Sequence, residues 1–235
     1  MPRIAGIDGC RGGWLVVCET PLPGPWSWLV APNYDAVWRR LKSFDAVGVD
    51  MPICIPDPGP RECEALARRL LSPRRSASIF SSPIRPILTM DDYTAACDTR
   101  EAIDGRRMSK QSFFIMEKIA EVDAVIRARR SFAEKLYEVH PEVSFAALGD
   151  GDPMLHAKRD QAGFEERLEH LSDVFPKAVI EEVIDTFPRA EVARDDVLDA
   201  FAVLWSAKRI ALSTAERLPD EPSYDSCGID MAIWY

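Results

Sequence analysis

The stretch RIAGIDGCRGGWLVVCE, residues 3–19, decides the fold of this chain. Residues 3–8 are mostly apolar and end on the carboxylate of Asp8, while residues 14–18 are apolar and rich in β-branched side chains, so each segment predicts a strand. Three glycines lie between them, and glycine adopts turn conformations that other residues avoid. Asp is depleted in strands and costly to bury without a partner. An Asp at the end of a central strand beside a glycine turn therefore suggests a metal or phosphate site, although Asp8 could instead only begin the turn.

Composition and charge narrow the classes of function. The length of 235 residues fits a single domain, residues 1–235, with one large insertion. The 29 basic and 38 acidic side chains give a formal net charge of −9, which argues against non-specific binding to nucleic acid or anionic membranes but leaves room for a local basic groove. The six cysteines lack the spacing of a zinc site, and no apolar run approaches the ~20 residues of a membrane span. No signal peptide is visible, so we expect a cytoplasmic protein without a membrane partner.

The first fifty residues predict three strands, a helix and a fourth strand. After the first two strands, the pattern predicts a proline-rich turn, a strand, a helix and a strand at residues 21–25, 26–31, 34–43 and 45–50. The first and fourth strands end on Asp8 and Asp50. If these strands are parallel neighbours, both carboxylates reach the same edge of the sheet, where open α/β sheets place their sites.

Residues 51–133 predict a largely helical insertion after the fourth strand. Within it, residues 61–85 hold six arginines against two acids, a local excess of four positive charges in an acidic chain. Arg74 and Arg75 are therefore candidates for a phosphate-binding rim, and the alternative is a solvated helix face with ion pairs. Residues 109–130 predict one long helix whose apolar stripe indicates core packing.

A fifth strand is predicted near residues 136–139. Glu138 is an acid on this otherwise buried strand, and His140 points the same way because alternate strand residues share a face. A lone histidine is more often a hydrogen-bonded structural residue than a ligand, and both interpretations of His140 stay open.

The helix predicted over residues 194–212 carries Asp195, Asp196 and Asp199 on its first two turns. Acids three and four positions apart share a helix face. Capping and the helix dipole explain one or two acids at a helix start. They explain Asp199 less well, because it lies one turn inside an apolar helix.

Together these features resemble the RNase H-like fold of RNase H, Holliday-junction resolvases and transposases. More closely, the chain is similar to a family of predicted nucleases of that fold, called domain of unknown function 429. The similar segments cover residues 6–14 (GIDGCRGGW), 49–53 (VDMPI), 78–83 (SIFSSP), 118–123 (KIAEVD), 137–145 (YEVHPEVSF) and 194–200 (RDDVLDA). The resemblance implies an α/β fold: an RNase H-like mixed five-stranded sheet flanked by helices, with the helical insertion after its fourth strand.

The resemblance also implies a metal-dependent nuclease that hydrolyses DNA or RNA. Its metal-binding and catalytic carboxylates would be Asp8, Asp50, Asp196 and Asp199, with Glu138 as a further catalytic candidate. RNase H-like enzymes often carry Glu on the fourth strand, where this chain has the shorter Asp50. Carboxylates without cysteine ligands suit Mg²⁺ or Mn²⁺, and two such ions can activate water and stabilise a leaving oxygen.

Several basic side chains are candidates for contact with a nucleic-acid substrate. Arg11 lies in the hairpin turn and Lys110 in the insertion, and they join Arg74, Arg75 and His140 as substrate-binding candidates. Each of the four cations could equally be a surface charge.

Two other functions remain open. A phosphotransferase of the actin and sugar-kinase type also begins with an Asp-bearing strand and a glycine hairpin, but it needs two such domains around ATP. A non-catalytic module could keep the same fold and only bind a partner, which would be consistent with the charge of −9.

Overall fold

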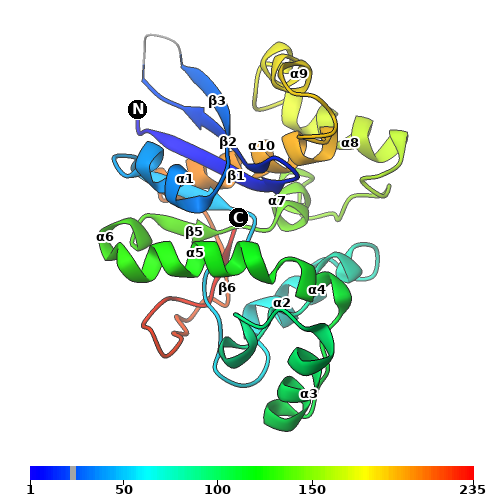
Figure 1. Cartoon of the computed structure of the whole chain (residues 1–235). Coiled ribbons are helices and arrows are strands. Elements are labelled where there is room, and N and C mark those ends of the chain that lie inside the picture. The colour runs from blue at the N-terminus through cyan, green and yellow to red at the C-terminus, as the bar shows by residue number, and fades with distance from the viewer. Residues whose placement is uncertain (22–24) are drawn as a thin grey trace.

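A mixed five-stranded sheet forms the centre of the computed structural model, which describes residues 1–21 and 25–235 (Figure 1). The strands are β1 (Ile4–Cys10), β2 (Gly13–Glu19), β3 (Trp26–Ala31), β4 (Ala46–Val49) and β5 (Leu136–Glu138), in the spatial order β3-β2-β1-β4-β5. β1 to β3 are antiparallel neighbours, whereas β4 runs parallel to β1 and β5 parallel to β4. The predicted α/β fold with a mixed five-stranded sheet is confirmed. Three residues of the turn predicted at 21–25 (22–24) lie outside the described residues.

The hairpin between β1 and β2 depends on Gly13. Its φ is +127°, and a Cβ there would lie 2.2 Å from the carbonyl oxygen of Ala31 on β3. A side chain is excluded on both grounds, so glycine is what allows β2 to lie between its two neighbours. Residues 14–18 of β2 are fully buried, as their apolar sequence predicts.

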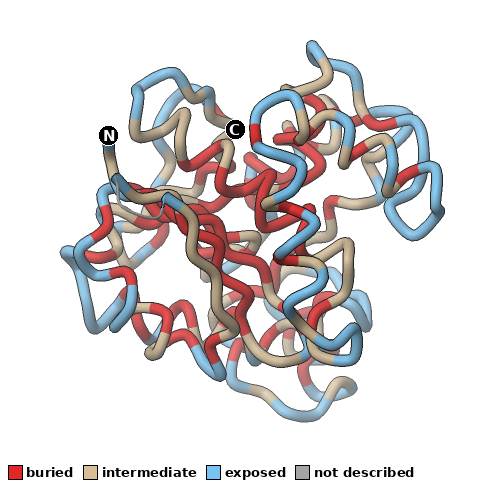
Figure 2. The backbone as a smooth tube through the Cα atoms, turned by 90° about the horizontal axis from the view of Figure 1, so that it is seen from above, coloured by how far each residue is buried: buried red, intermediate tan, exposed pale blue. Residues whose placement is uncertain are grey.

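The described part of the chain contains ten α-helices. They are α1 (Tyr34–Leu41), α2 (Glu62–Leu70), α3 (Tyr93–Asp104), α4 (Lys110–Phe114), α5 (Met116–Ala128), α6 (Arg130–Ala133), α7 (Pro141–Leu148), α8 (Gln161–Ser172), α9 (Lys177–Thr186) and α10 (Arg194–Ala211). Helices α1 and α5 bury their apolar sides on one face of the sheet, and α10 with α7 to α9 covers the other. Buried backbone runs through the middle of the molecule and exposed backbone lies on the outer loops (Figure 2). None of the described helices is long and apolar enough to cross a membrane.

The insertion between β4 and β5 is helical, as predicted, with two corrections. The single helix expected over residues 109–130 is broken at Ile115, which separates α4 from α5. Helix α3 was not predicted; it lies far from the sheet, at the lower end of Figure 1. Two short 3₁₀ turns, Ser76–Ser78 and Arg85–Ile87, follow α2 in the insertion.

The C-terminal segment adds a separate two-stranded sheet. β6 (Arg217–Leu218) pairs antiparallel with β7 (Ile233–Trp234). A single bridge between Val139 and Trp234 links this small sheet to the end of β5.

Two paired glycines let α10 approach the sheet closely. Gly6 on β1 and Gly48 on β4 are register partners. A Cβ on Gly6 would lie 2.3 Å from the carbonyl oxygen of Ala200, and one on Gly48 would lie 2.7 Å from a methyl carbon of Val203. Any larger residue at either position would push the helix outward, so this glycine pair sets how deeply α10 sits over the two central strands.

Candidate functional site

Matched spacings on the helix and the strands bring the four candidate aspartates together. Asp196 and Asp199 come four residues before Ala200 and Val203, the two α10 residues that cover the glycine pair. Asp8 and Asp50 come two residues after Gly6 and Gly48. Four residues along a helix span about 6 Å, and two residues along a strand span about 6.6 Å. Because α10 runs antiparallel to β1 and β4, these nearly equal distances bring the acids of the helix to the carboxylates at the ends of the strands.

The acids line one cleft of about 490 Å³ at the carboxyl ends of the parallel strands. Asp8 and Asp50 come from β1 and the end of β4, and Asp196 and Asp199 come from the first two turns of α10. Asp8 and Asp199 are almost completely buried, with 7% and 3% of their surface exposed. A cleft of this size at this edge of an α/β sheet is where a small ligand or part of a polymer would bind.

Burial and mutual repulsion raise the pKa values of these carboxyls. The pKa of Asp8 is raised well above its usual value, first by burial and then by the charges of Asp50, Asp199 and Asp196. Burial and the charge of Asp199 raise the pKa of Asp50 to about 8. Burial also raises the pKa of Asp196 to about 6, although the backbone N–H of Ala193 works against the shift. Ionising all of these carboxyls at once is therefore unfavourable in the metal-free protein.

Lys158, from the loop between α7 and α8, provides the nearest positive charge. Its Nζ donates a hydrogen bond to Oδ2 of Asp199 at 2.7 Å and lies 3.9 Å from Oδ2 of Asp195. The pKa of Lys158 is raised, most of all by Asp199, so the side chain stays charged. One ammonium thus offsets part of the charge of the acidic group.

The donor set fits a hard divalent cation in its chemistry, because every candidate ligand is a carboxylate. Its unneutralised charge is also what such a cation would stabilise. Across residues 1–21 and 25–235, however, no three His, Cys, Asp or Glu side chains stand close enough together to hold a metal ion. To bind Mg²⁺ or Mn²⁺, the carboxylates would have to close in and Lys158 would have to release Asp199.

Asp196 has a second, structural role. Its Oδ2 accepts a hydrogen bond of 2.8 Å from the backbone N–H of Ala193, directly before α10. This contact satisfies one of the N–H groups left free at a helix start. Capping therefore accounts for part of the role of Asp196 but for none of the role of Asp199, whose side chain accepts a hydrogen bond from Lys158.

Glu138 lines the same cleft as the aspartates, but its carboxylate is bound by an arginine. Its two oxygens accept hydrogen bonds of 2.6 and 2.7 Å from Arg61, and one also accepts from the backbone N–H of Ile53 at 3.1 Å. The assignment of Glu138 as a catalytic acid stays a prediction, and in this structure Glu138 is the buried ion-pair partner of Arg61. Strand alternation sets its position, because Glu138 is the register partner of Val49, which faces the core on the side opposite Asp50.

His140 lies in the wall of the cleft and also begins a helix. Its Nδ1 accepts a hydrogen bond of 3.2 Å from the backbone N–H of Glu142, in the first turn of α7. Burial lowers the pKa of His140 to about 4, so the ring is neutral near pH 7. The structural interpretation of His140 accounts for these contacts, and a neutral ring is a weak partner for a phosphate.

Three of the four cations predicted to hold substrate do not line the cleft. Arg11 and Lys110 are exposed outside it, and Arg74 donates to the carbonyl oxygen of Pro153 at 3.3 Å. Arg75 does line the cleft, but its guanidinium donates to the carbonyl oxygens of Met154 and Leu155. These two neighbouring arginines anchor the loop that carries Lys158.

Most of the arginine-rich segment is also used internally. Arg61 and Arg68 both pair with Glu64, and Arg85 pairs with Asp123 and Asp225. Three of the six arginines of residues 61–85 are therefore held in ion pairs, and two more donate to backbone carbonyl oxygens.

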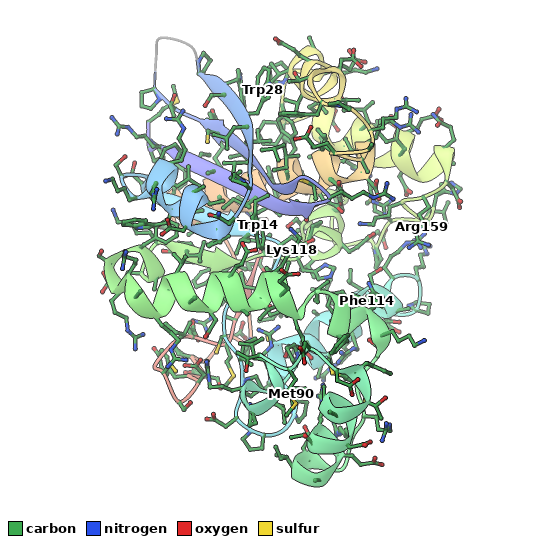
Figure 3. All side chains as sticks on the ribbon, in the orientation of Figure 1. Trp14, Trp28, Met90, Phe114, Lys118 and Arg159 are labelled. Carbon is green, nitrogen blue, oxygen red and sulfur yellow. The ribbon has the colours of Figure 1, made fainter. Side chains whose placement is uncertain are left out.

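Other cleft residues were missed by the sequence analysis. Lys118 of α5 lies in the cleft wall, where its Nζ donates to the carbonyl oxygen of Gly13 at 2.6 Å and stands 4.5 Å from the ring centre of Trp14 (Figure 3). Lys158, Arg159 and Phe114 line the cleft as well. Lys118 lies in one of the segments similar to the family, but nothing in the sequence places the other three beside residues far away in the chain.

The raised pKa values predict how the stability of the metal-free protein depends on pH. An acid whose pKa is raised by folding stabilises the protein fully below its unfolded pKa of about 4, and this contribution is lost as the pH rises through the folded value. With Asp196 at about 6 and Asp50 at about 8, we expect the melting temperature in EDTA to fall between about pH 5 and pH 8. Thermal melts of the wild type and Asp50→Asn across this range test it. The variant should show a flatter dependence, and equal slopes would contradict the assignment.

Comparison with known proteins shows to which family the chain belongs. No curated protein and no solved structure was found to match this chain. The profile of a family described as protein of unknown function (DUF429) matches residues 6–224, nearly the whole chain and all of the acids described above. The chain therefore belongs to the DUF429 family.

Proposed function

We propose that this protein is a metal-dependent nuclease that hydrolyses phosphodiester bonds of DNA or RNA. The observation that carries the proposal is the convergence of Asp8, Asp50, Asp196 and Asp199, from three separate elements, in one cleft. Three of them, Asp8, Asp50 and Asp196, have pKa values raised by neighbouring carboxylates as well as by burial, a pattern that is typical of functional sites. The order and directions of the strands are also consistent with the RNase H-like resemblance.

The carboxylate oxygens of these four aspartates would hold the Mg²⁺ or Mn²⁺ ions. When bound, such ions supply an activated water and stabilise the leaving oxygen of the phosphodiester. Lys118 and Arg159 line the walls of the same cleft and would orient the phosphate backbone. Lys158 would exchange its contact with Asp199 for a contact with substrate phosphate.

A second candidate function is a binding module without catalysis. The ion pair between Lys158 and Asp199 favours it, because a lysine can serve as the permanent counter-ion of an acidic group. Such a protein would bind its partner in EDTA as well as with metal, and it would cleave nothing.

The nuclease proposal predicts metal-dependent cleavage that requires the aspartates. Single- and double-stranded DNA and RNA should be incubated with Mg²⁺, Mn²⁺ or EDTA and resolved by length. We expect cleavage of at least one substrate with metal, none in EDTA, and loss to background in Asp8→Asn and Asp199→Asn. Asp185→Asn, an exposed acid on α9, is the matched control and should cleave normally. Metal-dependent cleavage that survives Asp8→Asn would place the active site elsewhere.

A further inference from the structure

One wall of the acidic cleft carries an exposed aromatic ring. Phe114, the last residue of α4, lines the cleft with 76% of its surface exposed. It is the most exposed Phe, Tyr or Trp in the described part of the chain. A single exposed apolar side chain is ordinary on a protein surface. What distinguishes Phe114 is its position in the cleft that holds the aspartates.

The surrounding structure holds the short helix that carries the ring. Ser109 caps α4 through the backbone N–H of Ser112, and the hydroxyl of Ser112 donates to the carbonyl oxygen of Ser81. Phe113 packs on Tyr93 with 5.4 Å between ring centres, and Phe114 lies edge-on to Phe113 at 6.1 Å. Phe114 is thus carried by a helix that is held in place by its neighbours, while most of its ring surface stays free of packing.

The charges around Phe114 suit a ligand with both phosphates and an aromatic face. Lys118 lies four residues further on and Arg159 across the cleft, and Figure 3 shows both on the side of the molecule that carries Phe114. Cations that follow a backbone, together with aromatic rings on which bases stack, are the two parts of a single-strand nucleic-acid site. In a duplex the base faces are covered by their neighbours, so a ring can stack on a base only where the base is unpaired.

We propose that Phe114 is a stacking platform for an unpaired base, which makes single-stranded nucleic acid the substrate class of this cleft. The inference rests on the proposed nuclease function and adds to it which form of nucleic acid is bound. Stacking needs only an aromatic face, so DNA and RNA strands share the chemistry, and the experiment below separates them.

Fluorescence anisotropy with labelled 20-nucleotide strands, in EDTA and in Ca²⁺, measures binding apart from cleavage. One DNA strand, the RNA strand of the same sequence and the matching DNA duplex are compared. We expect Phe114→Ala to weaken single-strand binding by about five- to 150-fold, the range for losing one stacked base. Phe114→Trp should retain binding, and duplex affinity should not change. Tyr224→Ala, with a ring that is 62% exposed outside the cleft, is the matched control and should bind normally.

A second readout follows the ring itself. A set of strands carries the fluorescent base 2-aminopurine, each strand at a different position. The wild type and Phe114→Trp should quench the fluorescence of 2-aminopurine at one of these positions, and Phe114→Ala should not. Unchanged single-strand binding in Phe114→Ala, or an equal loss for single strands and duplex, overturns the proposal while leaving the nuclease function intact. A wild type that binds none of the three probes overturns both.

Discussion

Mn²⁺ is expected to raise the melting temperature of the wild-type protein, and Asp8→Asn is expected to abolish that rise. The reason is the unneutralised charge of the acidic cleft, where burial and three neighbouring aspartates raise the pKa of Asp8. A cation that binds only the folded state stabilises it by about 2.7 kcal/mol at a hundred times its Kd. For a chain of this length that corresponds to a shift of roughly 5–10 °C. Differential scanning fluorimetry at pH 7.5 with increasing Mn²⁺ measures it.

Asp8→Asn keeps the shape of the side chain and removes one charge from the repelling group. The metal-free variant should therefore be as stable as the wild type or slightly more stable. If Asp8 were a structural acid, the same change would instead cost about 1 kcal/mol of stability through a lost hydrogen bond. A variant that melts lower, together with a wild type that does not respond to Mn²⁺, would rule out a metal site.

Lys158→Met makes the opposite change at the same site. It removes the ammonium bonded to Asp199, so the metal-free protein should melt lower and its stabilisation by Mn²⁺ should grow. Asp185→Asn again serves as the surface control and should follow the wild type. A Lys158→Met variant that leaves the Mn²⁺ response unchanged would show that Lys158 does not compete with metal.

Arg61→Met is expected to cost about 3–5 kcal/mol of stability, the usual range for breaking a buried ion pair by removing one partner. The Arg61 side chain is fully buried and donates to both oxygens of Glu138 and to one oxygen of Glu64. Burial raises the pKa of Glu138 even against the pull of Arg61, so the carboxylate has little support without the arginine. Urea unfolding followed by circular dichroism measures the loss, which corresponds to roughly 10 °C in melting temperature.

Two further variants test this explanation. Arg69→Met changes an exposed arginine on the same helix and should stay within about 0.5 kcal/mol of the wild type. Arg61→Met combined with Glu138→Met should recover part of the loss, because replacing both partners by apolar groups leaves no unpaired charge. If Arg61→Met alone were as stable as Arg69→Met, Glu138 would have found another partner.

The sequence determined the parts of the site that depend on local pattern. Asp8 closes the apolar run of β1 and Asp50 follows β4, so the two share one edge of the sheet once β1 and β4 pair in parallel. The acids of α10 were recognisable because Asp199 lies one turn inside an apolar helix, where capping does not explain it. Glycines at positions 6 and 48 are visible in the sequence as well, but only the packing of α10 shows why both are needed.

Only the tertiary structure decided which charges are free and which are paired. Arg61 meets Glu138 from 77 residues away, and Lys158 meets Asp199 from 41 residues away. The local periodicity of the sequence cannot predict such a pair, because the pair forms only when distant elements pack against each other. For the same reason, a segment with a positive excess became internal ion pairs, whereas Phe114 came to lie exposed in the cleft. The sequence thus determined where carboxylates gather, and the packing of distant segments decided which side chains face them.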